Sequence, residues 1–89
     1  MDIERFHNEL AMRLGYERIV KDKRIMISVE ESEEPFVTLK VDGYDDIRLK
    51  ASEKPKNQGA DMNPEMREVI IEIADTVHQA YIVASATKF

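Results

Sequence analysis

The sequence of 89 residues contains no cysteine and no tryptophan, and only three glycines and three prolines. Without cysteine the chain has no disulfides, no thiolate nucleophile and no Cys-ligated zinc or iron–sulfur site, which suits a reducing compartment. The wide spacing of Gly15, Gly43 and Gly59 excludes a glycine-rich phosphate loop. Because the 43% hydrophobic content is near that of folded proteins, we expect one globular domain over residues 1–89.

Long apolar runs and a secretory signal are also missing. The longest apolar stretch, residues 80–86, is far shorter than the roughly 20 apolar residues that a membrane-spanning helix needs. Charged residues interrupt the first 14 positions, so the apolar core of a signal peptide is absent there. We therefore expect a cytoplasmic protein with no membrane association.

An excess of basic residues is absent as well, because 18 acidic and 13 basic residues give a net charge of −5. A broadly basic surface for nucleic acid is therefore excluded. The negative charge is concentrated in one segment. Residues 30–46 hold seven acidic residues and one lysine, a net charge of −6, whereas the rest of the chain carries +1.

Apolar residues at helical spacing predict a helix near each end of the chain. The first helix spans residues 2–14, with Asp2 as its N-cap and Gly15 after its last turn. The second spans residues 64–84, with Asn63 as its N-cap and proline at its first position. The apolar stripe of the second helix comprises Met66, Val69, Ile70, Ile73, Val77, Ala80 and Ala84.

Alternating apolar and polar residues predict three strands, at residues 24–30, 36–41 and 47–51. We expect these strands to form an antiparallel meander with one apolar face. In its first hairpin, Val29 should face Val37 across the two strands.

Asp42-Gly43 resembles a two-residue hairpin turn, but a turn of that length would place Asp46 and Arg48 on the apolar face. A loop of odd length exchanges the two faces of the third strand and so places its apolar residues on the apolar face of the sheet, because side-chain direction in a strand has a period of two. We therefore expect a loop of three or five residues, with Gly43 or Tyr44 in a left-handed or bulged conformation.

These elements predict an α+β fold. It is a two-layer sandwich in which N- and C-terminal helices cover one face of a three-stranded antiparallel meander, in the order α-β-β-β-α. At about 30 Å, the second helix is longer than strands of about 20 Å, so its C-terminal part should overhang the sheet. The overhang carries Tyr81, Ile82 and Phe89, which the first helix or a second subunit must cover. We expect a homodimer that associates through Ile71, Tyr81 and Ile82.

Patterns that indicate catalysis or metal binding are scarce. His7 and His78 lie on different predicted helices, and a metal site needs a third ligand. Residues 42–46 offer hard oxygens for calcium but do not match the EF-hand spacing. No serine lies in a nucleophile elbow. We expect a non-enzymatic protein with no catalytic residue, no metal site and no cofactor.

The concentrated acidic residues are the main candidate for a functional surface. The candidate partner-binding residues are Glu31, Glu33, Glu34, Asp45 and Asp46. Such residues would steer a basic protein partner. The competing interpretation is that they only keep the hairpin turns soluble and protect strand edges from aggregation. The two turns of a meander lie at opposite ends of the sheet, which argues against one continuous acidic surface that imitates nucleic acid.

Two alternatives remain open. Single-stranded nucleic acid could bind to the cations Arg18, Lys21, Lys23 and Arg24, which precede the first strand. Only Phe36 is an aromatic residue on the outward strand face, so the sheet is a poor stacking platform and nucleic acid is the weaker interpretation. The second alternative is a structural subunit of a homo-oligomer.

The element order, acidic balance, small size and lack of cysteine are similar to those of small phage and mobile-element accessory proteins, including some acidic anti-CRISPR inhibitors. This resemblance covers the architecture, and no residue motif carries it. We predict a small protein-interaction module of the adaptor or inhibitor type, which uses its acidic hairpin turns and the apolar face of its C-terminal helix.

Overall fold

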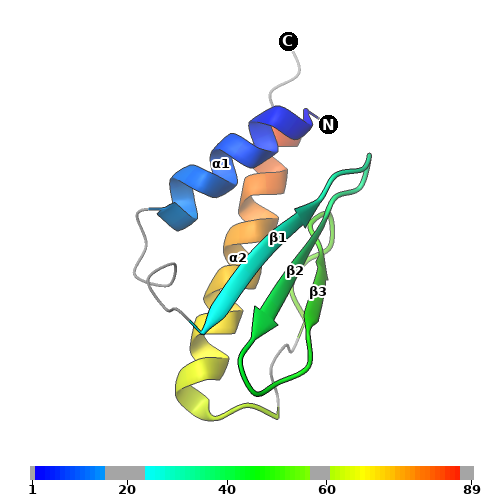
Figure 1. Cartoon of the computed structure of the whole chain (residues 1–89). Coiled ribbons are helices and arrows are strands. Elements are labelled where there is room, and N and C mark those ends of the chain that lie inside the picture. The colour runs from blue at the N-terminus through cyan, green and yellow to red at the C-terminus, as the bar shows by residue number, and fades with distance from the viewer. Residues whose placement is uncertain (1, 16–23, 57–60, 87–89) are drawn as a thin grey trace.

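The computed structural model describes residues 2–15, 24–56 and 61–86 (Figure 1). Its elements are helix α1 (Ile3–Gly15), strands β1 (Ile25–Glu30), β2 (Phe36–Val41) and β3 (Ile47–Lys50), and helix α2 (Pro64–Ala86). This order confirms the predicted α+β fold with the sequence α-β-β-β-α. The residues Arg18, Lys21, Lys23 and Phe89, to which predictions were attached, lie outside the described residues.

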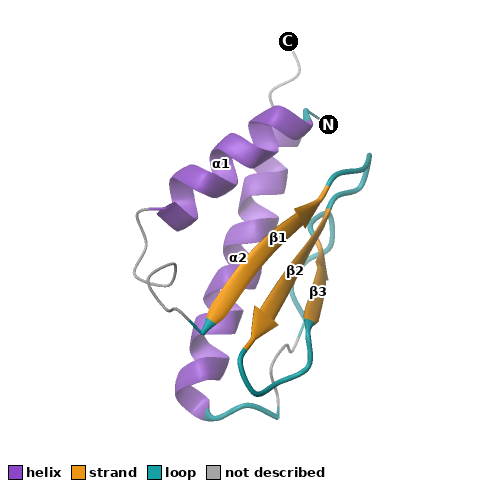
Figure 2. Ribbon diagram, viewed as in Figure 1, coloured by secondary structure: helices purple, strands orange, loops and turns teal. Residues whose placement is uncertain are grey.

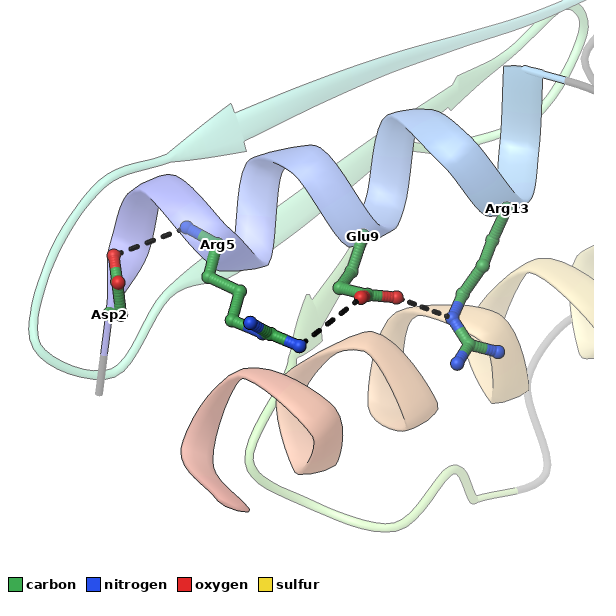
Figure 3. Close-up of polar contacts among 4 residues, drawn as sticks. All are labelled: Asp2, Arg5, Glu9 and Arg13. Carbon is green, nitrogen blue, oxygen red and sulfur yellow. Dashed lines mark hydrogen bonds and ion pairs between the residues drawn. The ribbon is translucent and has the colours of Figure 1, made fainter. Parts of the chain in front are cut away.

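Helix α1 begins at its predicted N-cap, because the carboxylate of Asp2 accepts the backbone N–H of Arg5 at 3.2 Å. One turn further, Glu9 lies between Arg5 and Arg13, at 3.9 and 3.4 Å (Figure 3). Ion pairs at this spacing support a helix from its surface. The buried face of α1 consists of Phe6, Leu10 and Leu14.

The strands form one antiparallel sheet in the order β1-β2-β3. Val29 lies opposite Val37, as predicted, and Leu49 lies opposite Val37 from the other side. Because β2 is the central strand, its inward residues Val37, Leu39 and Val41 are all buried. The predicted register is therefore confirmed.

The loop between β2 and β3 has the predicted odd length, since five residues, 42–46, separate the two strands. The N–H of Tyr44 donates to the carbonyl oxygen of Val41 at 3.0 Å, and Gly43 has a φ of 85°. A type II turn needs a positive φ at its third position, which glycine adopts without a steric cost. The left-handed conformation is thus confirmed at Gly43.

The two helices pack against each other on the apolar side of the sheet (Figure 2). Helix α1 runs beside the C-terminal half of α2 (Figure 1), so it covers part of the helix that was predicted to overhang the sheet. The buried face of α2 consists of Met66, Ile70, Ile73, Ala74, Val77, Ala80 and Ala84. It matches the predicted stripe except that Ala74 is buried and Val69 is half-buried.

Helix α2 begins at its predicted N-cap, where Oδ1 of Asn63 accepts the backbone N–H of Met66 at 2.9 Å. The substitution Asn63→Ala removes this acceptor and should lower the free energy of unfolding by about 1 kcal/mol, measured by urea denaturation. Asn8→Ala is the matched control, because Asn8 is exposed within α1 and should tolerate alanine without loss. Equal losses in the two variants would contradict the capping role.

Candidate functional site

The predicted partner-binding acids form two groups at opposite ends of the sheet. Glu31, Glu33 and Glu34 lie in the loop between β1 and β2, whereas Asp45 and Asp46 lie in the loop between β2 and β3. All of them are exposed. The structure therefore keeps the two groups apart, as expected for the turns of a meander.

The end of β1 and the loop between β1 and β2 are held by three side-chain contacts. Two are ion pairs, Glu30 with Arg48 at 2.9 Å and Glu34 with Lys50 at 3.1 Å, and the third is a hydrogen bond between Glu31 and His7 at 3.0 Å. The hydrogen bond to Glu34 raises the pKa of Lys50 above its ordinary value of 10.5, because the carboxylate favours the charged ammonium group. Exposed pairs contribute little stability one by one. Together, however, they connect this loop to β3 and α1.

Other acids are left available to a partner. Within residues 2–15, 24–56 and 61–86, no ion pair engages Glu33, Asp45 or Asp46. The loop that holds the two aspartates also lies beside the start of β1, because the backbone N–H of Asp42 donates to the carbonyl oxygen of Arg24 at 3.0 Å. Each end of β1 therefore lies close to an acidic loop.

The apolar residues of β1 face the core as predicted but are only half-buried. They are Ile25, Ile27 and Val29. In contrast, Val37 and Leu39 of β2 are 0% exposed. The cause is position, because β1 is the outer strand of the sheet and α1 packs chiefly against α2. On the outward face, Met26 is 67% exposed. Strand β1 thus presents apolar surface on both of its faces.

Two of the three predicted self-association residues are exposed. Ile71 and Ile82 are 42% and 44% exposed, and their spacing places them on one face of α2, about 16 Å apart. Tyr81 instead packs half-buried against the core. The exposed polar residues Asp75 and Gln79 lie between the two isoleucines along the helix. The outer face of α2 is therefore an interrupted apolar surface.

Each of the two histidines contacts a residue that follows a strand, and the two do not contact each other. Nε2 of His7 lies 3.0 Å from the carboxylate of Glu31. Nδ1 of His78 lies 2.9 Å from the carbonyl oxygen of Ala51, so this ring nitrogen is the donor. In the part of the chain that the structure describes, no group of three or more His, Asp or Glu side chains could hold a metal ion.

A groove of about 320 Å³ lies between β3, the segment that follows β3, and α2. Its polar lining includes Arg48, Lys50, Lys54, Lys56 and His78. This groove was not predicted from the sequence, because the net negative charge directs attention to the acidic residues. The available signal was the alternation of cations at positions 48 and 50, followed by 54 and 56.

No model of a known protein family, no curated protein and no solved structure matches this chain. Among the residues that the structure places, neither helix is long and apolar enough to cross a membrane.

The ion pair between Lys50 and Glu34 makes a direct prediction. Glu34→Gln should lower the pKa of Lys50 toward 10.5, because it removes the carboxylate that favours the charged ammonium group. The measurement is an NMR titration of the Lys50 side-chain carbons between pH 8 and pH 12. The matched control is Glu33→Gln, which should leave this titration unchanged. Equal shifts in both variants would show that the general field of the loop, and not the Glu34 contact, acts on Lys50.

Proposed function

We propose that this protein is a small, non-enzymatic interaction module that binds an extended, basic segment of another protein along the outer edge of β1. The observation that carries the proposal is the half-exposed apolar face of β1, beside the buried inward residues Val37, Leu39 and Val41 of β2. Addition of a strand to an exposed sheet edge is a common mode of peptide recognition. The added strand would cover apolar surface that the two helices leave open.

The backbone of β1 supports this mode of binding. Hydrogen-bonded and non-hydrogen-bonded pairs alternate along an antiparallel ladder. The N–H of Asp42 donates to the carbonyl oxygen of Arg24, so Arg24 belongs to a hydrogen-bonded pair. Every second residue after it, namely Met26, Ser28 and Glu30, therefore also forms hydrogen bonds with β2. The N–H and C=O groups of the intervening residues therefore point away from β2. Those residues are Ile25, Ile27 and Val29. No described strand pairs with β1 on that side.

Charge favours a basic partner over a second copy of the chain. Among the described residues, the loops at the two ends of β1 are both acidic: Glu31, Glu33 and Glu34 lie at one end, and Asp42, Asp45 and Asp46 at the other. Antiparallel pairing of two β1 edges would place one copy's first loop beside the other copy's second loop. Like charges would then repel each other. A partner segment with lysine or arginine beside these carboxylates meets no such repulsion from the two loops, and Arg24 is the described cation at the start of β1.

This proposal keeps the adaptor or inhibitor role that the sequence predicts, in a cytoplasmic setting. The similarity in architecture to phage and mobile-element accessory proteins supports such a role. The acidic residues steer the encounter, and the apolar face of β1 supplies the contact area. In this scheme Glu33, Asp45 and Asp46 act from the two loops beside the strand.

A peptide selection tests the proposal without knowledge of the natural partner. A display library of random 12-residue peptides should yield binders with alternating apolar residues and basic residues at both ends. Amide hydrogen exchange should then show slower exchange at Ile25, Ile27 and Val29 when a selected peptide is bound. The amides of Met26 and Ser28 already bond to β2 and serve as internal controls. Slowed exchange confined to α2, or no selected peptide at all, would refute the proposal.

Two substitutions at one position separate backbone from side-chain effects. Ile27→Pro removes the outward N–H, whereas Ile27→Ala keeps it, and both remove the isoleucine side chain. Ile27→Pro should weaken binding of a selected peptide by at least about tenfold relative to Ile27→Ala, as expected for the loss of a central hydrogen bond. Circular dichroism should show that both variants remain folded. Equal affinities in the two variants would contradict strand addition.

Self-association through α2 is the second candidate, favoured by the exposure of Ile71 and Ile82. It predicts that light scattering reports a mass of two chains at high concentration. The double substitution Ile71→Glu with Ile82→Glu should return the mass to that of one chain. A mass of one chain for the unmodified protein at all concentrations would exclude this dimer.

A further inference from the structure

The groove beside β3 gathers positive charge on a protein that is acidic as a whole. Four cations line it, Arg48, Lys50, Lys54 and Lys56, whereas Glu53 is the one carboxylate in its lining. The chain itself has a net charge of −5. A concave, cationic site on an acidic surface selects anions, because the field of the remaining surface repels them elsewhere.

The four cations fall into two pairs with different constraints. Arg48 and Lys50 are held in place, Arg48 by Glu30 at 2.9 Å and by stacking over the ring of Phe36, and Lys50 by Glu34 at 3.1 Å. Their side chains nevertheless remain 55% and 32% exposed. Lys54 and Lys56 are exposed, and no ion pair engages them within the described ranges. Lys50 also lies 3.9 Å from Glu53, the carboxylate of the lining. An incoming anion would therefore meet two cations that are paired with carboxylates and two that have no ion pair among the described residues.

Backbone and histidine donors are also close to the groove. Strand β3 is an outer strand of the sheet. The N–H of Ala51 donates to the carbonyl oxygen of Pro35 at 3.0 Å, and bonded residues alternate along an antiparallel ladder. The residues of β3 that bond to β2 are therefore Ile47 and Leu49. The N–H groups of Arg48 and Lys50 therefore point away from β2, toward the free edge. In His78, Nδ1 donates to Ala51, which leaves Nε2 available to a ligand.

The remaining lining and the size indicate what kind of anion fits. Of the apolar lining, Leu49, Ala74 and Val77 are at most 6% exposed, and Phe36 is half-buried with Arg48 over its ring. The groove therefore offers a small apolar surface to the organic part of a ligand beside its charged groups. A volume of about 320 Å³ lies at the lower end of the range for small-molecule sites. Arginine together with several lysines matches the multiple charges and oxygens of a phosphate group.

From this geometry we infer that the groove between β3, residues 51–56 and α2 binds a small organic phosphate of about mononucleotide size. Lys54, Lys56 and Lys50 contact the phosphate, and the apolar lining contacts the organic part. The inference is independent of strand addition at β1, because the two sites lie on opposite edges of the sheet.

An NMR titration of the full chain with adenosine 5′-monophosphate tests the inference, with inorganic pyrophosphate and a ten-nucleotide single-stranded DNA as parallel probes. The expected result is saturable binding of adenosine 5′-monophosphate, with shifts at the amides of Arg48, Lys50, Lys54 and His78. Weaker binding of pyrophosphate would agree with the apolar contribution. No saturable binding of the mononucleotide, or binding of the DNA alone, would overturn the inference of a small-ligand site.

A matched pair of variants checks the location. Lys54→Gln with Lys56→Gln should weaken adenosine 5′-monophosphate binding by at least about tenfold, as expected when two charge-assisted hydrogen bonds are lost. Lys40→Gln with Arg13→Gln removes the same charge, and both residues lie outside the groove lining, on β2 and α1, so this control should bind as the unmodified chain does. Equal weakening in both double variants would show a general charge effect and refute the site. Both double variants should keep the circular dichroism of the unmodified chain.

Discussion

The packing of α2 against the central strand is the contact on which the other elements depend. Ile70, Ile73 and Val77 of α2 and Val37 and Leu39 of β2 are all within 1% of complete burial. An 89-residue chain has one small core, so each element is stabilised in proportion to its contact with that core. Helix α1 joins it through α2, and β1 and β3 join it from either side of β2. The surfaces proposed to bind a peptide and a small ligand lie on β1 and β3, the two outer strands.

The sequence was sufficient for the features that depend on neighbours along the chain or across one hairpin. The N-caps at Asp2 and Asn63 follow from residue type and position. The odd loop and the positive φ of Gly43 follow from the requirement that Ile47 and Leu49 face inward with Val37 and Leu39. Such features are local because the two-residue period of a strand leaves few alternatives.

Features that depend on the position of α1 could not be predicted from the sequence. Strands β1 and β2 alternate in the same way in sequence, yet Ile27 is half-buried and Leu39 is fully buried. The difference arises because α1 packs chiefly against α2 and leaves β1 partly open. The cationic groove was equally hidden, since it needs α2 and residues 51–56 to lie along the same edge of the sheet. The acidic residues were visible in the sequence, but their ion pairs with Arg48 and Lys50 were not.

A three-stranded meander has two outer strands, and this has a consequence for the behaviour of the protein in concentrated solution. The outward backbone groups of both β1 and β3 can pair with other chains, which is the first step of fibrous or amorphous aggregation. Mutual repulsion between negatively charged molecules opposes that step. With an isoelectric point near 5.0, the repulsion fades in mildly acidic solution. The clustered carboxylates therefore also set the range of acidity over which the chains remain dispersed.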